Sequence, residues 1–276
     1  GISDTLGNLS SGGSIVTNLT NATAKDTNVT VTISDSNGTS VSASDLSAVG
    51  SSTTGTVTVS NAVNISGTQS EVTAALVTSS SKVTASTANV TVTSAVSVAQ
   101  GAAITDATNG TVTFSGGVSD SLSNLASSGS ITSNSDKIID EDATTSVTIT
   151  DADTTSVTAS DLSAVGAATT GTVTVTNAIV ISGSVSQATA ALVTDASKVV
   201  VSNAIVTLND ADAASITATA LSGIGSATSG TVTVTNAIAI SGSQAEVTAA
   251  LVTGSSKVVV SDAAVTINDA DATSLT

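Results

Sequence analysis

The sequence lacks seven residue types entirely. It contains no cysteine, proline, methionine, tryptophan, tyrosine, histidine or arginine, and its one aromatic residue is Phe114. Without cysteine and histidine, no thiolate site and no Ser–His or Cys–His nucleophile can form. The hydrophobic share of 40% is mostly alanine and valine, with some isoleucine and leucine. Because these side chains are small, we expect a thin core between closely spaced layers rather than a large globular interior.

Positive charge is also scarce. Five lysines stand against 21 carboxylates, which gives a net charge of −16. This balance repels nucleic acid and anionic lipid, so we expect neither as a partner. No apolar run approaches the roughly 18 residues of a membrane span, and we predict no membrane insertion. The chain begins with glycine and stops inside a repeat, so we expect a processed chain or a part of a longer one.

The same phrases return along the whole chain. The string GTVT starts at Gly55, Gly110, Gly171 and Gly230, at spacings of 55, 61 and 59 residues. Self-similarity at such a period is typical of proteins in which each repeat covers its neighbour. We therefore predict a single array of repeats over residues 1–276, with a unit of about 59 residues. Its units are expected at 1–54 (partial), 55–109, 110–170 (divergent), 171–229 and 230–276 (partial).

The segment that begins at Gly230 alternates apolar and polar residues. Val232, Val234, Ile238 and Ile240 share one parity, which predicts extended backbone with one buried face. The middle position of that parity is an asparagine in three units. Inward asparagines can hydrogen-bond from coil to coil as a ladder, or they can simply mark a turn between two short strands. The asparagines of this predicted ladder are Asn61, Asn177 and Asn236.

Two kinds of short helix follow the predicted strands. Ser243 and Glu246 form the S-x-x-E pattern of a capping box, in which side chains and backbone N–H groups at the helix start satisfy each other. The pairs Thr68 with Glu71 and Ser184 with Gln187 repeat this pattern. In TASDLSAVG, Thr158 and Asp161 predict the start of a second kind of helix, and Gly166 predicts its end.

These elements together predict a mainly β fold. We expect a parallel β-solenoid (β-helix) with short helical segments and about two coils per 59-residue repeat. A two-sheet sandwich is the alternative, and it requires turn signals every roughly 8 to 12 residues. The hairpin dipeptides NG and DG do not recur at strand spacing, so the sandwich ranks second.

Acidic residues gather in turns that follow the predicted strands. VTITDAD, VTLNDAD and VTINDAD each end on a D-x-D pair, and VTISDSN is a weaker copy. Alternating carboxylates offer the hard oxygen ligands that Ca²⁺ prefers, although a Ca²⁺ site also needs carbonyls or a neighbouring coil. In the alternative interpretation, the same side chains cap the short helices that follow. The candidate metal ligands are Asp35, Asp151, Asp153, Asp210, Asp212, Asp269 and Asp271.

Two further patterns leave alternatives open. Asp140, Glu141 and Asp142 form either a local ion site or a charged loop in the divergent unit. The threonines of GTVTVT resemble the rows of ice-binding solenoids, but outward threonine is also the ordinary choice on exposed strands.

The phrases TTGTVTV, SGTQSEVTAALVT and VTINDADATS resemble a known class of repeat. They are similar to the repeat regions of very large bacterial cell-surface or extracellular filament proteins of cyanobacteria and marine bacteria, which are adhesin-like or surface-layer-like. The resemblance implies an adhesin, surface layer, sheath or filament outside the cell. The calcium-binding nonapeptide GGxGxD of many such proteins is absent, so the resemblance does not extend to its calcium site.

Taken together, these patterns predict an extracellular or cell-surface structural repeat protein. We expect it to form a rod, filament, sheath or surface layer through stacked, self-associating coils, with itself as partner in a homopolymer or a lateral assembly. A calcium-dependent adhesin stalk or ligand-binding module of a giant surface protein is the alternative. No enzyme activity is expected, because the acidic residues recur with the repeat instead of forming one unique pair. No cofactor is required, and Ca²⁺ is the one ion that the acidic turns suggest.

Overall fold

The computed structural model describes residues 1–269, which belong to two compact units. The first unit comprises Gly1–Ser119 and Ser133–Thr145, and the second comprises Asp120–Thr132 and Ser146–Thr276. The expectation of a single array over 1–276 stays a prediction.

The first unit alternates short strands with helices. Its strands are β1 (Ile2–Asp4), β2 (Ser10–Ser11), β3 (Ser14–Ile15), β4 (Val31–Ile33), β5 (Ser40–Ser42), β6 (Val57–Val59), β7 (Asn64–Gly67), β8 (Val83–Thr84), β9 (Asn89–Val92) and β10 (Val112–Phe114). Its helices are α1 (Leu6–Leu9), α2 (Thr17–Lys25), α3 (Ala43–Ser52), α4 (Gln69–Val72), the π-helix η1 (Thr73–Val77), the 3-10 helix η2 (Ser79–Ser81), α5 (Val98–Thr105) and α7 (Ser133–Glu141).

The second unit follows the same plan. Its strands are β11 (Val118–Asp120), which enters it at Asp120, β12 (Ala126–Ser127), β13 (Ser130–Ile131), β14 (Val147–Ile149), β15 (Ser156–Thr158), β16 (Val173–Val175), β17 (Val180–Gly183), β18 (Val199–Val200), β19 (Ile205–Leu208), β20 (Ser215–Thr217), β21 (Val232–Val234), β22 (Ile238–Gly242), β23 (Val258–Val260) and β24 (Ala263–Ile267). Its helices are α6 (Leu122–Leu125), α8 (Ala159–Ala168), α9 (Val185–Leu192), the 3-10 helix η3 (Asp195–Ser197), α10 (Ala218–Ala227), α11 (Gln244–Val247), the π-helix η4 (Thr248–Val252) and the 3-10 helix η5 (Gly254–Ser256).

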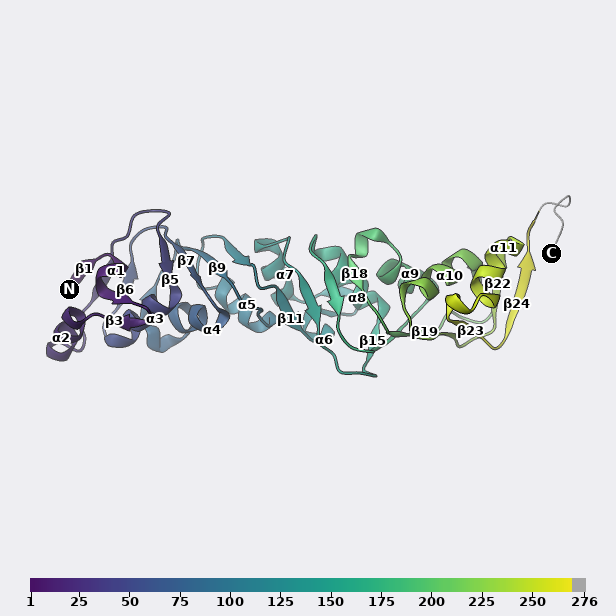
Figure 1. Ribbon diagram of the computed structural model, residues 1–276, viewed down its shortest axis with the longest axis horizontal. Helices are drawn as coiled ribbons and strands as arrows, with labels where there is room; N and C mark the ends of the chain where they lie inside the picture. Colours follow the sequence, from purple (N-terminus) through teal and green to yellow (C-terminus); the bar gives the residue numbers. More distant parts are fainter. Residues whose placement is uncertain (270–276) are drawn as a thin grey trace. The chain divides into compact units, whose positions relative to one another are not determined.

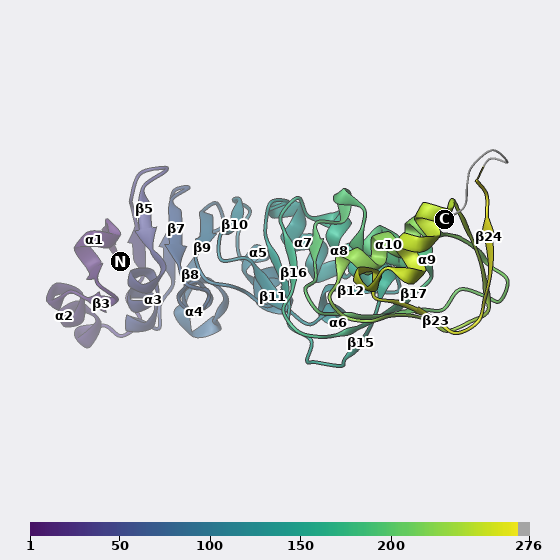
Figure 2. The same ribbon diagram turned by 45° about the vertical axis from the view of Figure 1, so that its right-hand side comes forward.

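We use the word module for two or three strands followed by a helical segment. Strands of consecutive modules pair in parallel, so that β5, β7, β9 and β10 lie side by side (Figures 1 and 2). In the second unit, the longest such ladder is β15–β17–β19–β21–β23. The register places like residues over each other, as in Val31 over Val57 and Val57 over Val83. The inward valines and isoleucines therefore form continuous buried columns, as the alternation predicted for Val232, Val234, Ile238 and Ile240, all of which are buried.

The prediction of a mainly β fold is wrong. Over residues 1–269 the chain is mixed α/β, with 37% helix and 28% strand, several short parallel sheets and 11 α-helices, and it is neither a β-solenoid nor a β-helix. The reason lies in segments such as ASDLSAVGSS, where Ala43, Leu46, Val49 and Gly50 follow the spacing of one helix face and are all buried. Short helical segments are expected here from the sequence, whereas α3, α8 and α10 are each ten residues long and supply buried residues to the core.

Two antiparallel hairpins also depart from the prediction. The strands β2 and β3 form one, and β12 and β13 form the other. Each consists of two-residue strands, and Gly13 and Gly129 adopt positive φ in their turns. They replace the ordinary module helix by a short helix, a hairpin and a second helix, which explains why the Gly110 unit is divergent in sequence.

The predicted helix starts are confirmed. Both bonds of the capping box are present at Thr68, Ser184 and Ser243, and the side chain of Thr158 accepts a hydrogen bond from the backbone N–H of Asp161. The predicted helix end at Gly166 is wrong, because this glycine lies inside α8. A Cβ there would overlap the carbonyl oxygen of Ser197 in the next module. Close approach of two modules, and not a C-terminal stop, therefore requires glycine at this position.

Candidate functional site

The acidic turns lie where the sequence placed them, directly after strands. Asp35 follows β4, Asp151 follows β14, Asp210 follows β19 and Asp269 follows β24. Asp271 lies outside the described residues.

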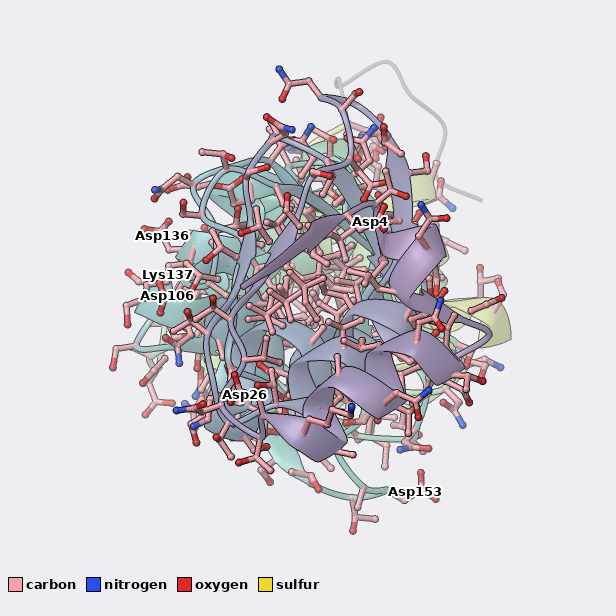
Figure 3. All side chains as sticks on the ribbon, turned by 90° about the vertical axis from the view of Figure 1, so that its left-hand side faces the viewer. Asp4, Asp26, Asp106, Asp136, Lys137 and Asp153 are labelled. Carbon is pink, nitrogen blue, oxygen red and sulfur yellow. The ribbon has the colours of Figure 1, made fainter. Side chains whose placement is uncertain are left out.

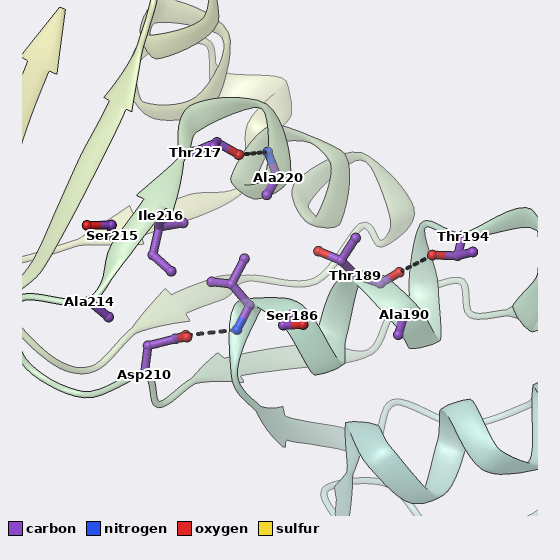
Figure 4. Close-up of a pocket in the computed structure, with 11 residues that line it drawn as sticks. Ser186, Thr189, Ala190, Thr194, Asp210, Ala214, Ser215, Ile216, Thr217 and Ala220 are labelled. Atoms are coloured by element: carbon purple, nitrogen blue, oxygen red, sulfur yellow. Dashed lines mark hydrogen bonds between the residues drawn. The ribbon is translucent and has the colours of Figure 1, made fainter.

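The first carboxylate of each acidic turn caps a helix of the preceding module. The Oδ2 atom of Asp210 accepts a hydrogen bond of 2.8 Å from the backbone N–H of Val185, the first residue of α9 (Figure 4). A carboxylate at this place satisfies an N–H that has no partner inside the helix and meets the positive end of its dipole. The same bond joins Asp35 to Leu6 at 2.7 Å, Asp151 to Leu122 at 2.6 Å, and Asp269 to Gln244 at 2.7 Å.

The second acidic side chain bonds forward, to the turn of the next module. The Oδ1 atom of Asp153 accepts from the backbone N–H of Ala178 at 2.8 Å, and that of Asp212 accepts from Ala237 at 3.1 Å. In the weaker copy of the turn, Asn37 Oδ1 accepts from Ala62 at 2.9 Å.

The asparagines of the predicted ladder occupy the same corner. The Nδ2 group of Asn61 donates to the carbonyl oxygen of Asp35 at 2.7 Å. Asn177 donates likewise to Asp151 at 2.7 Å, and Asn236 to Asp210 at 2.6 Å. Each asparagine is half-buried at the bend between two short strands. The amides bond to backbone carbonyls of the acidic turn in the preceding module, so each corner is a carboxylate–asparagine lock between two modules.

The first carboxylate of each acidic turn therefore acts as a cap in this structure, but the capped helix belongs to the preceding module, whereas the alternative interpretation of the sequence predicted capping of the helix that follows. Within residues 1–269, no group of three or more aspartate or glutamate side chains gathers as a metal ion would require. At each turn, a backbone N–H already occupies one carboxylate oxygen. Calcium binding at Asp35, Asp151, Asp153, Asp210, Asp212, Asp269 and Asp271 stays a prediction.

The cluster at residues 140–142 has a role that the sequence analysis missed. The strand β10 is the last of its ladder, so its outward N–H groups face no further strand. Glu141 Oε2 accepts from the backbone N–H of Val112 at 3.2 Å, and Asp142 Oδ2 accepts from that of Phe114 at 2.9 Å. At the equivalent place in the second unit, Val232 N–H donates to a backbone carbonyl, that of Lys257. Two carboxylates thus stand where a further strand would pair, which blocks this edge.

A second missed feature holds the hairpins in place. Asp45 Oδ1 accepts from the backbone N–H of Gly13 at 2.7 Å, and Asp161 Oδ1 accepts from that of Gly129 at 2.6 Å. The third helix of this kind carries Ala220 at the same position, and no hairpin precedes it. The sequence holds this signal, because aspartate stands in DLSAVG only where the preceding module contains the string SSGGSI or SSGSI.

A third missed feature is a threonine two residues before the glycine of GTVT. Thr53 donates through Oγ1 to the carbonyl oxygen of Val29 at 2.7 Å and accepts from Gly55 N–H at 3.0 Å. This buried hydroxyl therefore joins two modules and shapes the entry to the strand. Thr108 and Thr228 make the same pair of bonds, with Ala88 and Gly110 and with Ala204 and Gly230.

Three of the five lysines occupy a special backbone conformation, and a fourth forms an ion pair. Lys82, Lys198 and Lys257 adopt positive φ at the ends of the 3-10 helices and directly precede β8, β18 and β23. In the first unit, Lys137 forms an ion pair of 2.7 Å with Asp106 (Figure 3). Both side chains are exposed, so this pair contributes about 0–1 kcal/mol.

A pocket lies in the second unit, between α9, the Asp210 turn and β20 (Figure 4). Its volume is about 490 Å³, and Ser186, Thr189 and Ile216 lie in its wall. The carboxylate of Asp210 faces it but is already bonded to α9. The pocket thus offers a mostly apolar hollow with one partly satisfied carboxylate.

Comparison of the chain with family models, curated proteins and solved structures found no match. The β-solenoid and β-helix descriptions are wrong, and nothing in residues 1–269 gives evidence for the extracellular or adhesin functions that the resemblance implied. None of the described helices has the length and apolar character that crossing a membrane requires.

Proposed function

We propose that the chain is a structural repeat protein that builds an assembly from stacked modules. One observation carries this proposal. The recurring polar side chains at the corners of the modules bond to the backbone of a neighbouring module, as Asp210 does with Val185, Asn236 with Asp210, and Thr228 with Ala204. These hydrogen bonds join neighbouring modules, as expected in a structural scaffold.

The module interfaces also suit repetition. Like residues lie over like residues, as in Val206 over Val232 and Thr207 over Thr233, and glycine stands at places where two backbones approach closely. Stability in such an array accumulates from nearest-neighbour contacts, so further modules can be added without a new core. Self-association is the partnership that we propose for the assembled protein.

Analytical ultracentrifugation of the full chain tests the proposal. Because the net charge of −16 opposes association, we expect the mean mass to rise with protein concentration and with NaCl, which screens the repulsion. A matched series in CaCl₂ at equal ionic strength separates screening from specific calcium bridging. Negative-stain microscopy of the same samples should show regular assemblies. A monomer at every concentration and salt level would contradict self-association.

A further inference from the structure

Asparagines with a serine or threonine two residues later are concentrated in the first unit. Eight of its ten asparagines stand in this N-x-S/T sequence, and none of the six asparagines of the second unit does. Serine and threonine make up 99 of the 276 residues, so only about one asparagine in three would do so by chance. N-x-S/T is the sequence in which an asparagine side chain can accept a sugar. The eight asparagines are Asn8, Asn18, Asn21, Asn28, Asn37, Asn64, Asn89 and Asn109.

The fold engages three of these asparagines through their own amide groups. An acceptor needs a free Nδ2 group, because this nitrogen forms the bond to the sugar. Asn8 Nδ2 already donates to Asp4 Oδ1 at 2.7 Å. Asn64 Nδ2 donates to the carbonyl oxygen of Gly38 at 3.0 Å, and Asn89 Nδ2 donates to Asn64 Oδ1 at 3.1 Å. Because these amide groups hold parts of the chain together, we expect no sugar on them.

Three more asparagines lack a free hydroxyl two residues later, which a transferase must bind. Thr20 and Thr23 donate to carbonyl oxygens one helical turn earlier, at 3.2 and 3.1 Å, and Thr111 donates to an asparagine side chain at 3.1 Å. These hydroxyls belong to the sequences of Asn18, Asn21 and Asn109. The helix α2 excludes its two sequences for a further reason, because residues two apart on a helix do not face each other.

The two remaining asparagines, Asn28 and Asn37, have both groups free. Both are exposed and lie in turns. Among the described residues, no hydrogen bond engages the Nδ2 group of either asparagine or the hydroxyl of Thr30 or Thr39. The sequence groups the same pair, because DTNVT and DSNGT share a D-x-N-x-T string that occurs nowhere else in the chain. One transferase could therefore recognise both.

We propose that Asn28 and Asn37 are sites of N-linked glycosylation, with a glycosyl diphosphate as the sugar donor. In this reaction, the amide nitrogen Nδ2 bonds to the anomeric carbon of the sugar, and the bond from that carbon to the diphosphate oxygen breaks. The diphosphate leaves with the electron pair, and the nitrogen gives up one proton to a base of the transferase. The donor is a polyprenyl diphosphate sugar or a nucleotide sugar, because both carry this leaving group.

The attached sugar is compatible with the contacts of both turns. Asn37 Oδ1 accepts from the backbone N–H of Ala62 at 2.9 Å, and after glycosylation this oxygen is still the carbonyl oxygen of an amide. Asn28 contacts Asp26 through its backbone N–H, at 3.2 Å, and not through its side chain. Beside Asn37, a Cβ on Gly38 would meet no atom within 4 Å, so there is open space at this turn.

The equivalent turns of the second unit supply matched variants. Asp153 occupies the position of Asn37, and its Oδ1 atom accepts from the next module in the same way. Thr154 and Gly38, which follow them, adopt positive φ of 65° and 76°. Asp153→Asn therefore creates the sequence N-T-T in the same kind of turn. Asp212→Asn creates N-A-A, which lacks the hydroxyl.

The test treats the purified, folded full chain with each donor class and a transferase that accepts N-x-S/T, and intact mass spectrometry counts the sugars. We expect two sugars per chain, one in Asn28→Gln or Asn37→Gln, and none in the double variant. Asp153→Asn should raise the count to three, and Asp212→Asn should leave it at two. The donor class that reacts identifies the source of the sugar.

A synthetic peptide of residues 85–95 is the control for the effect of the fold. It frees Asn89 from its hydrogen bond and should be modified in both reactions. No transfer to the chain where this peptide is modified, sugar on the Asn28→Gln and Asn37→Gln double variant, or equal counts for Asp153→Asn and Asp212→Asn would each overturn the inference. The inference does not depend on self-association, so a monomeric chain would leave it unchanged.

Discussion

The turn after β9 and the turn after β19 perform one task with different residues. At the first, Ser94 Oγ accepts from the backbone N–H of Gln69 at 2.8 Å, where Asp210 at the second accepts from Val185. A neutral hydroxyl thus replaces a carboxylate at the start of the capped helix. The cap needs an acceptor and not a charge, which favours the capping interpretation of the acidic turns over a metal site.

The same two turns show which parts of the corner belong together. The Ser94 turn is shorter and has no second acidic residue, and the following module carries Gly116 in place of asparagine. A Cβ on Gly116 would overlap the backbone of Ser94. The D-x-D sequences that begin at Asp151 and Asp210 are followed by Asn177 and Asn236 in the next module. The longer turn and the asparagine therefore form one structural unit, the carboxylate–asparagine lock.

The largest loss of stability is expected where a substitution forces two modules apart. In Gly225→Ala, the new Cβ would overlap the carbonyl oxygen of Ser256, and we expect a loss of about 3 kcal/mol in unfolding free energy. Gly223→Ala in the same helix is the control. Its Cβ would lie 3.3 Å from Val193, so we expect a change within about 1 kcal/mol. Urea denaturation measures both, and equal losses would contradict the close-approach explanation.

The cap itself can be exchanged between the two turns. Asp210→Ala leaves the N–H of Val185 without its acceptor, and we expect a loss of about 2 kcal/mol. Asp210→Ser imitates the Ser94 turn and should recover part of that loss, and Asp210→Asn most of it. Urea midpoints, with amide hydrogen exchange at Val185, give the order. If serine and asparagine were no better than alanine, the charge of Asp210 would be essential and a neutral acceptor would not suffice.

The hydrogen bond from the hairpin residue Gly129 to Asp161 allows a second comparison, with the equivalent helix that no hairpin precedes. Asp161→Ala removes the acceptor for Gly129 N–H and should cost about 1 kcal/mol. Ala220→Asp introduces the same aspartate where no hairpin precedes the helix, so we expect little change. Thermal unfolding and hydrogen exchange at Gly129 measure the effect. A matching stabilisation in Ala220→Asp would mean that aspartate acts on its own helix rather than on a hairpin.

Calcium separates the two interpretations of the acidic turns directly. If the turns are caps, Ca²⁺ and Mg²⁺ at equal ionic strength should raise the melting temperature equally, by screening alone. The Asp153→Asn and Asp212→Asn double variant should then respond like the parent chain. A rise specific to Ca²⁺ that disappears in this variant would instead support the predicted calcium site.

The smallest expected effect compares two capping boxes. The N3 residue is Glu246 in the box of α11 and Gln187 in the box of α9. The N–H of Ser243, the side chain of Thr219 and the hydroxyl of Ser243 lower the pKa of Glu246 below its ordinary 4.5. A lowered pKa in the folded state means that this stabilisation is present above pH 4.5 and is lost as the pH falls through the lower value.

At α9, the same position holds Gln187, which does not titrate. We therefore expect the Ser243 amide to exchange faster relative to the Ser184 amide as the solution is acidified below pH 4.5. Hydrogen exchange followed by NMR measures the two amides in one sample. Glu246→Gln should abolish the difference, and an unchanged difference in that variant would assign it to another group.

Part of this fold could be predicted from the sequence, and part could not. Strand parity, the capping boxes and the position of each acidic turn followed from local patterns, because residues a few positions apart suffice to define them. The balance of helix to strand did not follow, because the pattern in TASDLSAVG marks where a helix begins but not how long the helix is or how much of the core it supplies. The role of Gly166 was also hidden, because it depends on Ser197 in another module.

The sequence by itself determined the repeat, the alternation that buries Val232 and Val234, and the places where helices begin. The repeat is read directly from the recurring strings, and the alternation and the helix starts are short-range properties, decided by residues within one turn of a helix or one strand. Only the tertiary structure decided what the polar residues bond to: that Asp210 caps α9, that Asn236 holds the Asp210 carbonyl, and that Glu141 and Asp142 close the β10 edge. The physical reason is that each of these bonds joins residues some 25 or more positions apart, and only the stacking of modules brings them within hydrogen-bonding distance.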